Sequence, residues 1–414
     1  MASCCWQFCL KRKRKSDATS SIRSAIQRLT TILENRKVIE LDCFLSKEDG
    51  FRREQLDPNL SVIHYVAGRQ FNSEKEVKEW LGYLAVNRDE SINKPAGRQE
   101  VRPLHCACKW GDALGVRWLV RHGANVNVQD RNGLTPYSLA CSSSVERNLK
   151  MTILEEHGCT LMPIDIVLAG SAQFSSYADA DRVFDHLVNE KGLRVNAVDE
   201  KENTPLHLAC LVGSIFGVKW LVEHSSPFNI CNWNGTTPFM AACKSSKNRL
   251  AKVRYLNAKG ADCQSKDRTK GRTALFYAIF DSKCGDVEEV LQYLVDEKNL
   301  DINAVDEDGM TPLLAACDIC PSFVVIQQLI ALGADVSVRD QRGQNALHLA
   351  AKTTNEMKII DLLIKNGVDV TCSDEDGSVP YQLAIDDEIK AFLLQHYNAI
   401  ESNLALLPNQ VAPD

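Results

Sequence analysis

The segment Thr204-Pro205-Leu206-His207 restricts what this chain can fold into more than any other feature, because variants of it recur along most of the sequence. Clear copies begin at Arg102-Pro103, Thr135-Pro136 and Thr237-Pro238, and weaker ones at Thr273-Ala274, Thr311-Pro312, Asn345-Ala346 and Val379-Pro380. The prolines are 33 residues apart in two pairs of clear copies, Pro103 with Pro136 and Pro205 with Pro238. A period of this length corresponds to one small supersecondary unit, so the chain is built by repetition.

The composition of the motif predicts the start of a helix. Threonine offers an N-cap hydroxyl, and proline suits the first helical position, where its missing N–H has no partner to lose. Small residues such as Ala107-Cys108 follow where two helices must approach closely. A second helix carries an aliphatic stripe over residues 116–120 and ends near Gly123. The turn at residues 130–133 then leads into the next copy, so each unit is a helix, a helix and a projecting turn.

This arrangement resembles the ankyrin repeat, whose signature is a Thr-Pro-Leu-His-x-Ala helix start at a spacing of 33 residues. The resemblance covers about ten units and implies an all-α repeat solenoid of stacked helix-turn-helix pairs. It further implies that the turns project as fingers at one edge and that the first helices line a concave face. We assign residues 59–400 to the solenoid, 19–58 to an N-terminal helical cap, 1–18 to a disordered Cys-rich polybasic tail and 401–414 to a disordered C-terminal tail.

The sequence also has a second, longer period of about three repeats. The segment Gly115–Val120 is echoed by Gly217–Val222, which lies 102 residues later. Every third unit also carries extra residues, at Tyr177–Arg194 and Cys284–Leu300. We therefore expect a copied module of three repeats whose third member has a lengthened second helix or loop.

The repeat phase explains most of the reactive side chains. Five of the 16 cysteines occupy the same position in the repeat, five residues after the proline of a motif copy: Cys108, Cys141, Cys210, Cys243 and Cys317. A free cysteine at such a site behaves as a small buried hydrophobe. His105, His207 and His348 also share one phase, where the resemblance implies hydrogen bonds between repeats. With no zinc-finger spacing and no catalytic motif, we predict no metal site, no cofactor and no enzymatic activity.

The N-terminal segment has a functional signal of its own. Cys4, Cys5 and Cys9 lie among apolar residues, and the basic cluster Lys11, Arg12, Lys13, Arg14 and Lys15 follows directly. Thiols beside apolar and basic residues favour S-acylation and attachment to an anionic membrane surface. Residue 2 is alanine, which does not support N-myristoylation. A nuclear-localisation cluster and a solvated tail are the alternative interpretations.

The charge of the chain bears on its partners. The formal net charge is −6, and the first fifteen residues contain five basic and no acidic side chains, so the remaining chain is strongly acidic. Such a solenoid is a poor nucleic-acid binder, and we expect protein partners and no small-molecule substrate. The resemblance places contacts at turn tips and after the first helices, here at Lys109, Trp110, Arg131, Asn132, Leu211, Val212, Trp233, Asn234, Lys244, Asp318 and Lys352. Trp233 ranks first, because aromatic anchors dominate interface energetics.

These patterns favour a non-enzymatic scaffold or adaptor that binds proteins through its fingers and concave face. The tail predicts a cytoplasmic protein held at the cytosolic face of a membrane, with the nucleus as the alternative. Two other functions fit the same residues: a substrate-recognition subunit of a ubiquitin ligase, and a nuclear regulatory protein that uses the basic cluster as its localisation signal.

Overall fold

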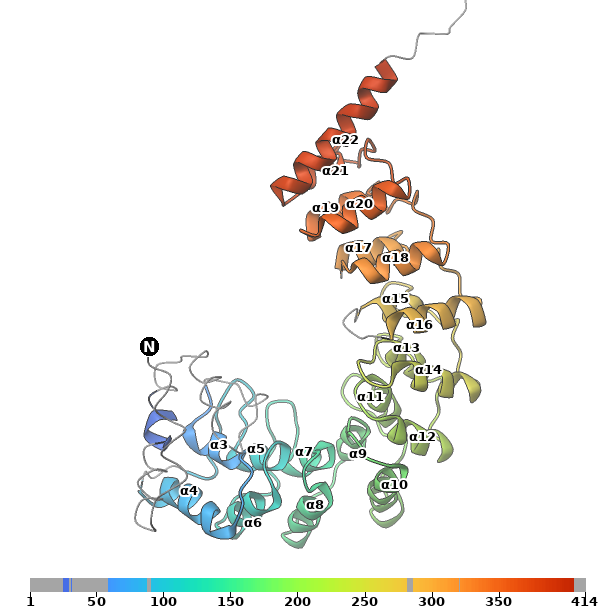
Figure 1. Ribbon diagram of the computed structural model, residues 1–414. Helices are drawn as coiled ribbons and strands as arrows, with labels where there is room; N and C mark the ends of the chain where they lie inside the picture. The colour runs from blue at the N-terminus through green and yellow to red at the C-terminus, as the bar shows by residue number, and fades with distance from the viewer. Residues whose placement is uncertain are drawn as a thin grey trace, which may run out of the picture. The chain divides into compact units, whose positions relative to one another are not determined.

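The computed structural model describes residues 25–29, 31, 59–87, 91–280, 286–319 and 321–405. These residues fall into two units, one ending at Ala197 and one beginning at Val198, and each consists of stacked helix pairs (Figure 1). Within the described ranges the regular structure is helical, apart from an isolated bridge between Ala96 and Val101. The predicted all-α repeat solenoid is therefore confirmed.

The first unit contains four helix pairs in its described part. They are α3 (Val62–Ala67) with α4 (Glu74–Asn87), α5 (Pro103–Lys109) with α6 (Ala113–Arg121), α7 (Pro136–Ser142) with α8 (Arg147–Glu156), and α9 (Pro163–Gly170) with α10 (Tyr177–Asp185) and its continuation η2 (His186–Glu190). First helices pack on first helices, as α5 does on α7, and second helices pack on second helices, as α6 does on α8. Each pair thus buries its apolar faces against its neighbours in the stack.

The second unit contains six helix pairs in its described part. They are α11 (Pro205–Leu211) with α12 (Ile215–Glu223), α13 (Pro238–Cys243) with α14 (Arg249–Ala258), α15 (Ala274–Ile279) with α16 (Val287–Gln292) and η3 (Tyr293–Glu297), α17 (Pro312–Ile319) with α18 (Phe323–Ala331), α19 (Ala346–Thr353) with α20 (Met357–Lys365), and α21 (Pro380–Leu383) with α22 (Asp387–Ala405). The same pattern of neighbouring first and second helices holds here (Figure 1).

The helix starts follow the chemistry of the repeated motif. The Oγ1 atoms of Thr135 and Thr237 accept hydrogen bonds from backbone N–H groups three residues later, at 3.1 and 3.2 Å. Pro136 and Pro238 follow at the first helical position. Asn345 takes the place of threonine at α19, where its Oδ1 accepts from the N–H of His348 at 3.1 Å. These side chains satisfy N–H groups that have no partner within the helix.

The histidines that share one repeat phase connect neighbouring repeats, as the resemblance implies. The Nδ1 atom of His207 accepts a hydrogen bond from the N–H of Thr204, and its Nε2 lies 3.0 Å from the carbonyl oxygen of Thr236 in the next repeat. His105 and His348 bond the carbonyl oxygens of Leu134 and Ser378 in the same way. Burial lowers the pKa of all three imidazoles, which favours the neutral form that this pattern requires.

The five cysteines of the repeat phase are part of the core. Each is fully buried and free, in agreement with the structural role predicted for this position. They lie on the first helices α5, α7, α11, α13 and α17, which pack on the first helices of adjacent repeats. Burial raises the pKa of these thiols, to about 12 for Cys108, Cys210 and Cys317.

The lengthened third repeats take the form of π-helical turns. α10 continues into η2, and α16 continues into η3, five residues in each case. A π turn inserts residues into a helix without interrupting its backbone hydrogen bonding. The extra residues predicted for every third unit are thus accommodated at the end of the second helix.

The ends of the chain differ in part from the predicted domain borders. The last helix, α22, extends to Ala405, so helix replaces the disorder predicted for residues 401–405. Residues 25–29 and 31 of the predicted N-terminal helical cap lie in the described part; they are helical, and Ala25, Ile26 and Leu29 are buried. The predicted tail at residues 1–18 lies outside the described residues, and so does most of the predicted cap at 19–58.

Candidate protein-interaction surface

The turn fingers are built on aspartate or asparagine side chains. In the finger at residues 199–203, the Oδ1 atom of Asp199 accepts hydrogen bonds from the N–H groups of Lys201 and Asn203, at 2.9 and 2.8 Å. The same pair of bonds recurs at Asp130, Asn232, Asp306, Asp340 and Asp374. This local bonding holds each finger in one conformation before any partner binds.

Backbone hydrogen bonds also join each finger of the second unit to the next. The N–H of Trp233 donates to the carbonyl oxygen of Lys201 at 3.1 Å, and the N–H of Arg268 donates to that of Asn234 at 3.0 Å. Equivalent bonds run from Glu307 to Lys270, from Gln341 to Asp308 and from Glu375 to Arg342. The fingers of this unit therefore form one hydrogen-bonded row.

The close approach of two fingers predicts a difference between two glycines. Gly235 and Gly377 both have positive φ, at 76° and 75°. A Cβ atom on Gly235 would lie 2.3 Å from the backbone nitrogen of Arg268, whereas one on Gly377 meets nothing within 4 Å. We expect Gly377→Ala to cost about 1–2 kcal/mol of unfolding free energy, from backbone strain alone. Gly235→Ala should cost at least ~2 kcal/mol more, because the fingers must separate. Chemical denaturation of both variants measures the difference, and equal losses would contradict the finger packing.

Trp233 is the most exposed large apolar side chain in the described part of the chain, with 71% of its surface accessible. It follows Asn232 at the tip of the finger 232–236, and both of its neighbouring fingers leave it uncovered. Packing against an adjacent finger, the alternative to a binding role, is therefore not what the structure shows. An indole held on a rigid backbone and open to solvent is suited to anchor a partner.

The other predicted contact residues lie at the surface to different degrees. Exposed side chains are those of Lys109, Arg131, Asn132, Val212, Asn234, Lys244 and Asp318, and half-buried ones are those of Trp110, Leu211 and Lys352. Lys109 packs over the Trp110 ring at 5.1 Å, and Lys352 donates to Gln344 Oε1 at 2.8 Å. Lys109, Trp110, Arg131 and Asn132 belong to the first unit and the remainder to the second.

A family model of the single ankyrin repeat matches residues 102–131. A model of three ankyrin repeats matches residues 173–267 and 251–323, and a model of many ankyrin repeats matches residues 329–384. The chain belongs to the ankyrin repeat family. Among curated relatives, human Rabankyrin-5 is 33% identical over 151 residues, which are 36% of this chain and 12% of that protein. Palmitoyltransferase AKR1 of Lachancea kluyveri is 24% identical over 68% of this chain and 34% of its own length. The transient receptor potential cation channel subfamily A member 1 of Drosophila melanogaster is 27% identical over 40% of this chain and 14% of its own length.

Two solved ankyrin repeat structures are among those similar to this chain. The ankyrin repeat domain of human ASB11 shares 25% identity with a TM-score of 0.45, covering 53% of this chain and 96% of that domain. The ankyrin repeat domain of Bcl-3 shares 24% identity with a TM-score of 0.42, covering 57% of this chain and 99% of that domain. The chain spans no more than about a third of the length of the curated relatives given above.

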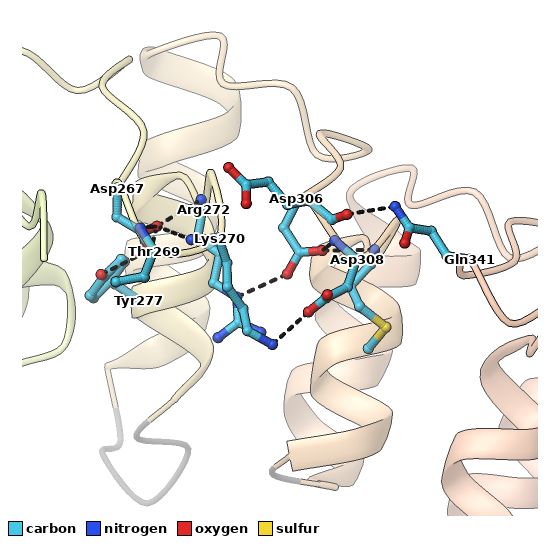
Figure 2. Close-up of polar contacts among 10 residues, drawn as sticks. Asp267, Thr269, Lys270, Arg272, Tyr277, Asp306, Asp308 and Gln341 are labelled. Carbon is cyan, nitrogen blue, oxygen red and sulfur yellow. Dashed lines mark hydrogen bonds and ion pairs between the residues drawn. The ribbon is translucent and has the colours of Figure 1, made fainter.

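Part of the positive charge around the finger at residues 267–272 is neutralised by the next finger. Lys266, Arg268, Lys270 and Arg272 are close in sequence, but Figure 2 shows that two of these cations face the acidic finger that follows. The Nζ of Lys270 lies 2.5 Å from Asp308 Oδ2, and the Nε of Arg272 lies 2.9 Å from Asp306 Oδ2. Of these four cations, Lys266 and Arg268 are exposed and lie outside both pairs.

One surface residue was not singled out from the sequence. Phe280 is the first residue after α15, as Lys244 is the first residue after α13. Two cations lie near its ring. The Nζ of Lys244 is 5.7 Å and the Cζ of Arg272 is 5.3 Å from the ring centroid. Both distances suit cation–π attraction. The repeat phase could have identified Phe280, but the Thr273-Ala274 copy is too degenerate to mark that phase clearly.

Two buried lysines were also not singled out from the sequence. Lys150 of α8 donates from its Nζ to the carbonyl oxygen of Cys108 at 2.9 Å and to Ser143 Oγ at 2.9 Å. Lys252 of α14, 102 residues later, donates to the carbonyl oxygen of Cys210 at 3.0 Å and to the Oγ of Ser245 at 2.9 Å. Each ammonium thus satisfies the C-terminal end of the first helix in the preceding repeat, where a cation is favourable. Both Ser–Lys pairs are fully enclosed, which leaves no access for a substrate.

A buried arginine precedes each lysine by three residues and points toward the following repeat. Arg147 donates to the carbonyl oxygen of Ser143 at 2.9 Å and lies over the ring of Phe174 at 4.5 Å. Arg249 donates to the carbonyl oxygens of Ser245 and Ala278, at 2.8 and 2.9 Å. Each Arg–Lys pair therefore links three consecutive repeats. The signal was present in the sequence as Ser-Ser-x-x-Arg-x-x-Lys, repeated after 102 residues.

Other kinds of site find no support in the described residues. No group of three histidine, cysteine or acidic side chains there is arranged to hold a metal ion. Among the same residues, no helix combines the length and the apolar character needed to cross a membrane. The predicted lipidation sites Cys4, Cys5 and Cys9, and the basic cluster from Lys11 to Lys15, lie outside the described part of the chain.

Proposed function

We propose that this ankyrin repeat protein is a non-enzymatic scaffold that binds protein partners through its finger tips and the ends of its first helices. Ankyrin repeats support binding of proteins, and the exposed side chain of Trp233 is the observation that carries the assignment to this surface. The finger row is held by its own backbone bonds, so little conformational freedom is lost on binding. Lys244, Phe280 and Arg272 add a cationic and aromatic group at the first-helix ends.

We propose further that the N-terminal segment tethers the scaffold to the cytosolic face of a membrane. Acyl groups on Cys4, Cys5 and Cys9 would provide one attachment, and the cations from Lys11 to Lys15 would attract anionic lipid. One acyl chain alone binds reversibly, and a second signal makes the anchoring stable.

The binding surface is tested by Trp233→Ala. We expect the variant to lose at least one partner that co-purifies with the wild-type chain, because truncation of a central aromatic anchor commonly costs 2 kcal/mol or more, about a 30-fold loss of affinity. The melting temperature should not change, since the indole fills no core. Ile385→Ala is the matched control, because Ile385 is 68% exposed and lies outside the fingers. An unchanged set of partners in the Trp233 variant would refute this surface.

The tether is tested by fractionating cells that express the wild type or a Cys4→Ser, Cys5→Ser, Cys9→Ser variant. The wild type should sediment with membranes and incorporate an alkyne-labelled palmitate analogue, and the variant should do neither. Replacement of Lys11 to Lys15 by glutamine should weaken the membrane association without abolishing the label. A wild type that stays soluble, or accumulates in the nucleus, would contradict the tether and leave the binding surface unaffected.

A further inference from the structure

The first three fingers of the second unit carry charges of opposite sign on the two sides of Trp233. The finger 232–236 lies between its neighbours, since Trp233 bonds Lys201 on one side and Asn234 bonds Arg268 on the other. The finger 199–203 exposes Glu200 and Glu202. The finger on the opposite side exposes Lys266 and Arg268. The order along the row is thus acidic, aromatic, basic.

These four charges are available for binding. None of them forms an ion pair with another described residue, in contrast to Lys270, which pairs with the next finger. Lys201 offsets part of the charge of the acidic finger, which stays net negative because Asp199, Glu200 and Glu202 outnumber it. Two further apolar side chains are exposed just before the first two fingers, Val198 at 48% and Ile230 at 40%. An exposed apolar centre between opposite charges is the composition of a specific interface.

We propose that this finger edge binds the same edge of a second copy of the chain. In a two-fold arrangement with Trp233 near the axis, the acidic finger of each copy faces Lys266 and Arg268 of the other. The two indoles then lie together at the centre, and the same patch is used on both copies. A patch that carries both signs in this order is complementary to itself, whereas a foreign partner would need the matching order. The inference rests on the finger surface of the proposed function and identifies a second copy of the chain as one partner that binds there.

Three finger tips form a small interface, so the association should be weak and depend on concentration. Sedimentation equilibrium of the full chain under reducing conditions should show a mass that rises from 46.1 kDa toward twice that value as concentration increases. Trp233→Ala should weaken the association at least about tenfold, because each dimer loses two indoles. Ile385→Ala is the control and should associate as the wild type does. A Cys4→Ser, Cys5→Ser, Cys9→Ser chain should also associate normally, which separates this contact from tail chemistry.

Charge reversal tests the two-fold arrangement itself. Glu200→Lys with Glu202→Lys should give monomers, and so should Lys266→Glu with Arg268→Glu, because each places like charges opposite one another. Mixing the two variants should restore a dimer, and a chain with all four changes should dimerise on its own. A mixture that stays monomeric while both variants keep the wild-type melting temperature would overturn the proposal.

A second measurement covers the case in which a variant fails to fold. The dissociation constant of the wild type should rise at least severalfold between about 50 and 500 mM salt, because the contact depends on exposed charges. No association at any salt concentration would also overturn the proposal. If the wild type stays monomeric but Trp233→Ala still loses protein partners, self-association is wrong and the proposed function stands. If the wild type dimerises through Trp233 but no other protein depends on it, the proposed function fails instead.

Discussion

Replacing Arg249 with methionine is expected to lower the free energy of unfolding of the second unit by about 3–5 kcal/mol, as when one partner of a buried ion pair is removed. The guanidinium is fully buried and donates to two backbone carbonyl oxygens in two successive repeats. Its Nε also lies 3.5 Å from Asp286 Oδ1. Methionine fills most of the volume but donates no hydrogen bond, so both carbonyl oxygens lose this donor and Asp286 loses its ion-pair partner.

Arg254→Met is the matched control, since Arg254 lies on the same helix. Its side chain is 57% exposed and pairs with the equally exposed Glu297 at 3.8 Å. An exposed pair of this kind contributes at most about 1 kcal/mol. Thermal denaturation should therefore show a drop on the order of 10 °C for Arg249→Met, given about 2–4 °C per kcal/mol for a unit of this size, and little change for Arg254→Met. Similar melting temperatures for the two variants would show that the hydrogen bonds of Arg249 do not stabilise the packing of successive repeats.

The helix pairs could be predicted from the sequence because their signals are local. The Thr-Pro start places a capping hydroxyl and a preorganised φ at adjacent positions, and it needs no distant partner. Trp233 could be placed at a finger tip because Asn232 and Gly235 are typical of a tight turn. The histidine and cysteine roles followed from their shared phase in the repeat.

Contacts between repeats could not be predicted in the same way. Whether Lys270 stays free or meets Asp308 depends on how two fingers are aligned, which the composition of either finger does not show. The finger at 267–272 also carries one residue more than its neighbours, with a bond from the N–H of Asp267 to the carbonyl of Arg272. Arginine and lysine are usually exposed in folded proteins. The repetition of the Arg–Lys pair after 102 residues therefore did not by itself predict that these side chains are buried.

The stability of the second unit should fall as the pH rises above about 9, because burial raises the pKa of its thiols, among them the three fully buried ones of Cys210, Cys243 and Cys317. For Cys210 and Cys317 the pKa moves from 9.0 to about 12, and that of Cys243 moves in the same direction. The unfolded chain then releases protons at a lower pH than the folded chain, so alkali favours unfolding. Each thiol contributes about 1.4 kcal/mol per pH unit between its unfolded and folded pKa, or about 4 kcal/mol per unit for the three together.

Replacing Cys210, Cys243 and Cys317 with alanine should remove most of that slope, whatever the cost of the smaller side chains at neutral pH. Urea denaturation at several pH values from 7 to 11 measures it. Lys252 acts with the opposite sign: burial lowers the pKa of its ammonium to about 8, so it adds stability as the pH rises from about 8 to 10.5. Lys252→Met should therefore make the alkaline loss steeper, while the cysteine variant makes it shallower. Parallel profiles for the wild type and both variants would mean that these groups titrate in the folded unit as they do in the unfolded chain.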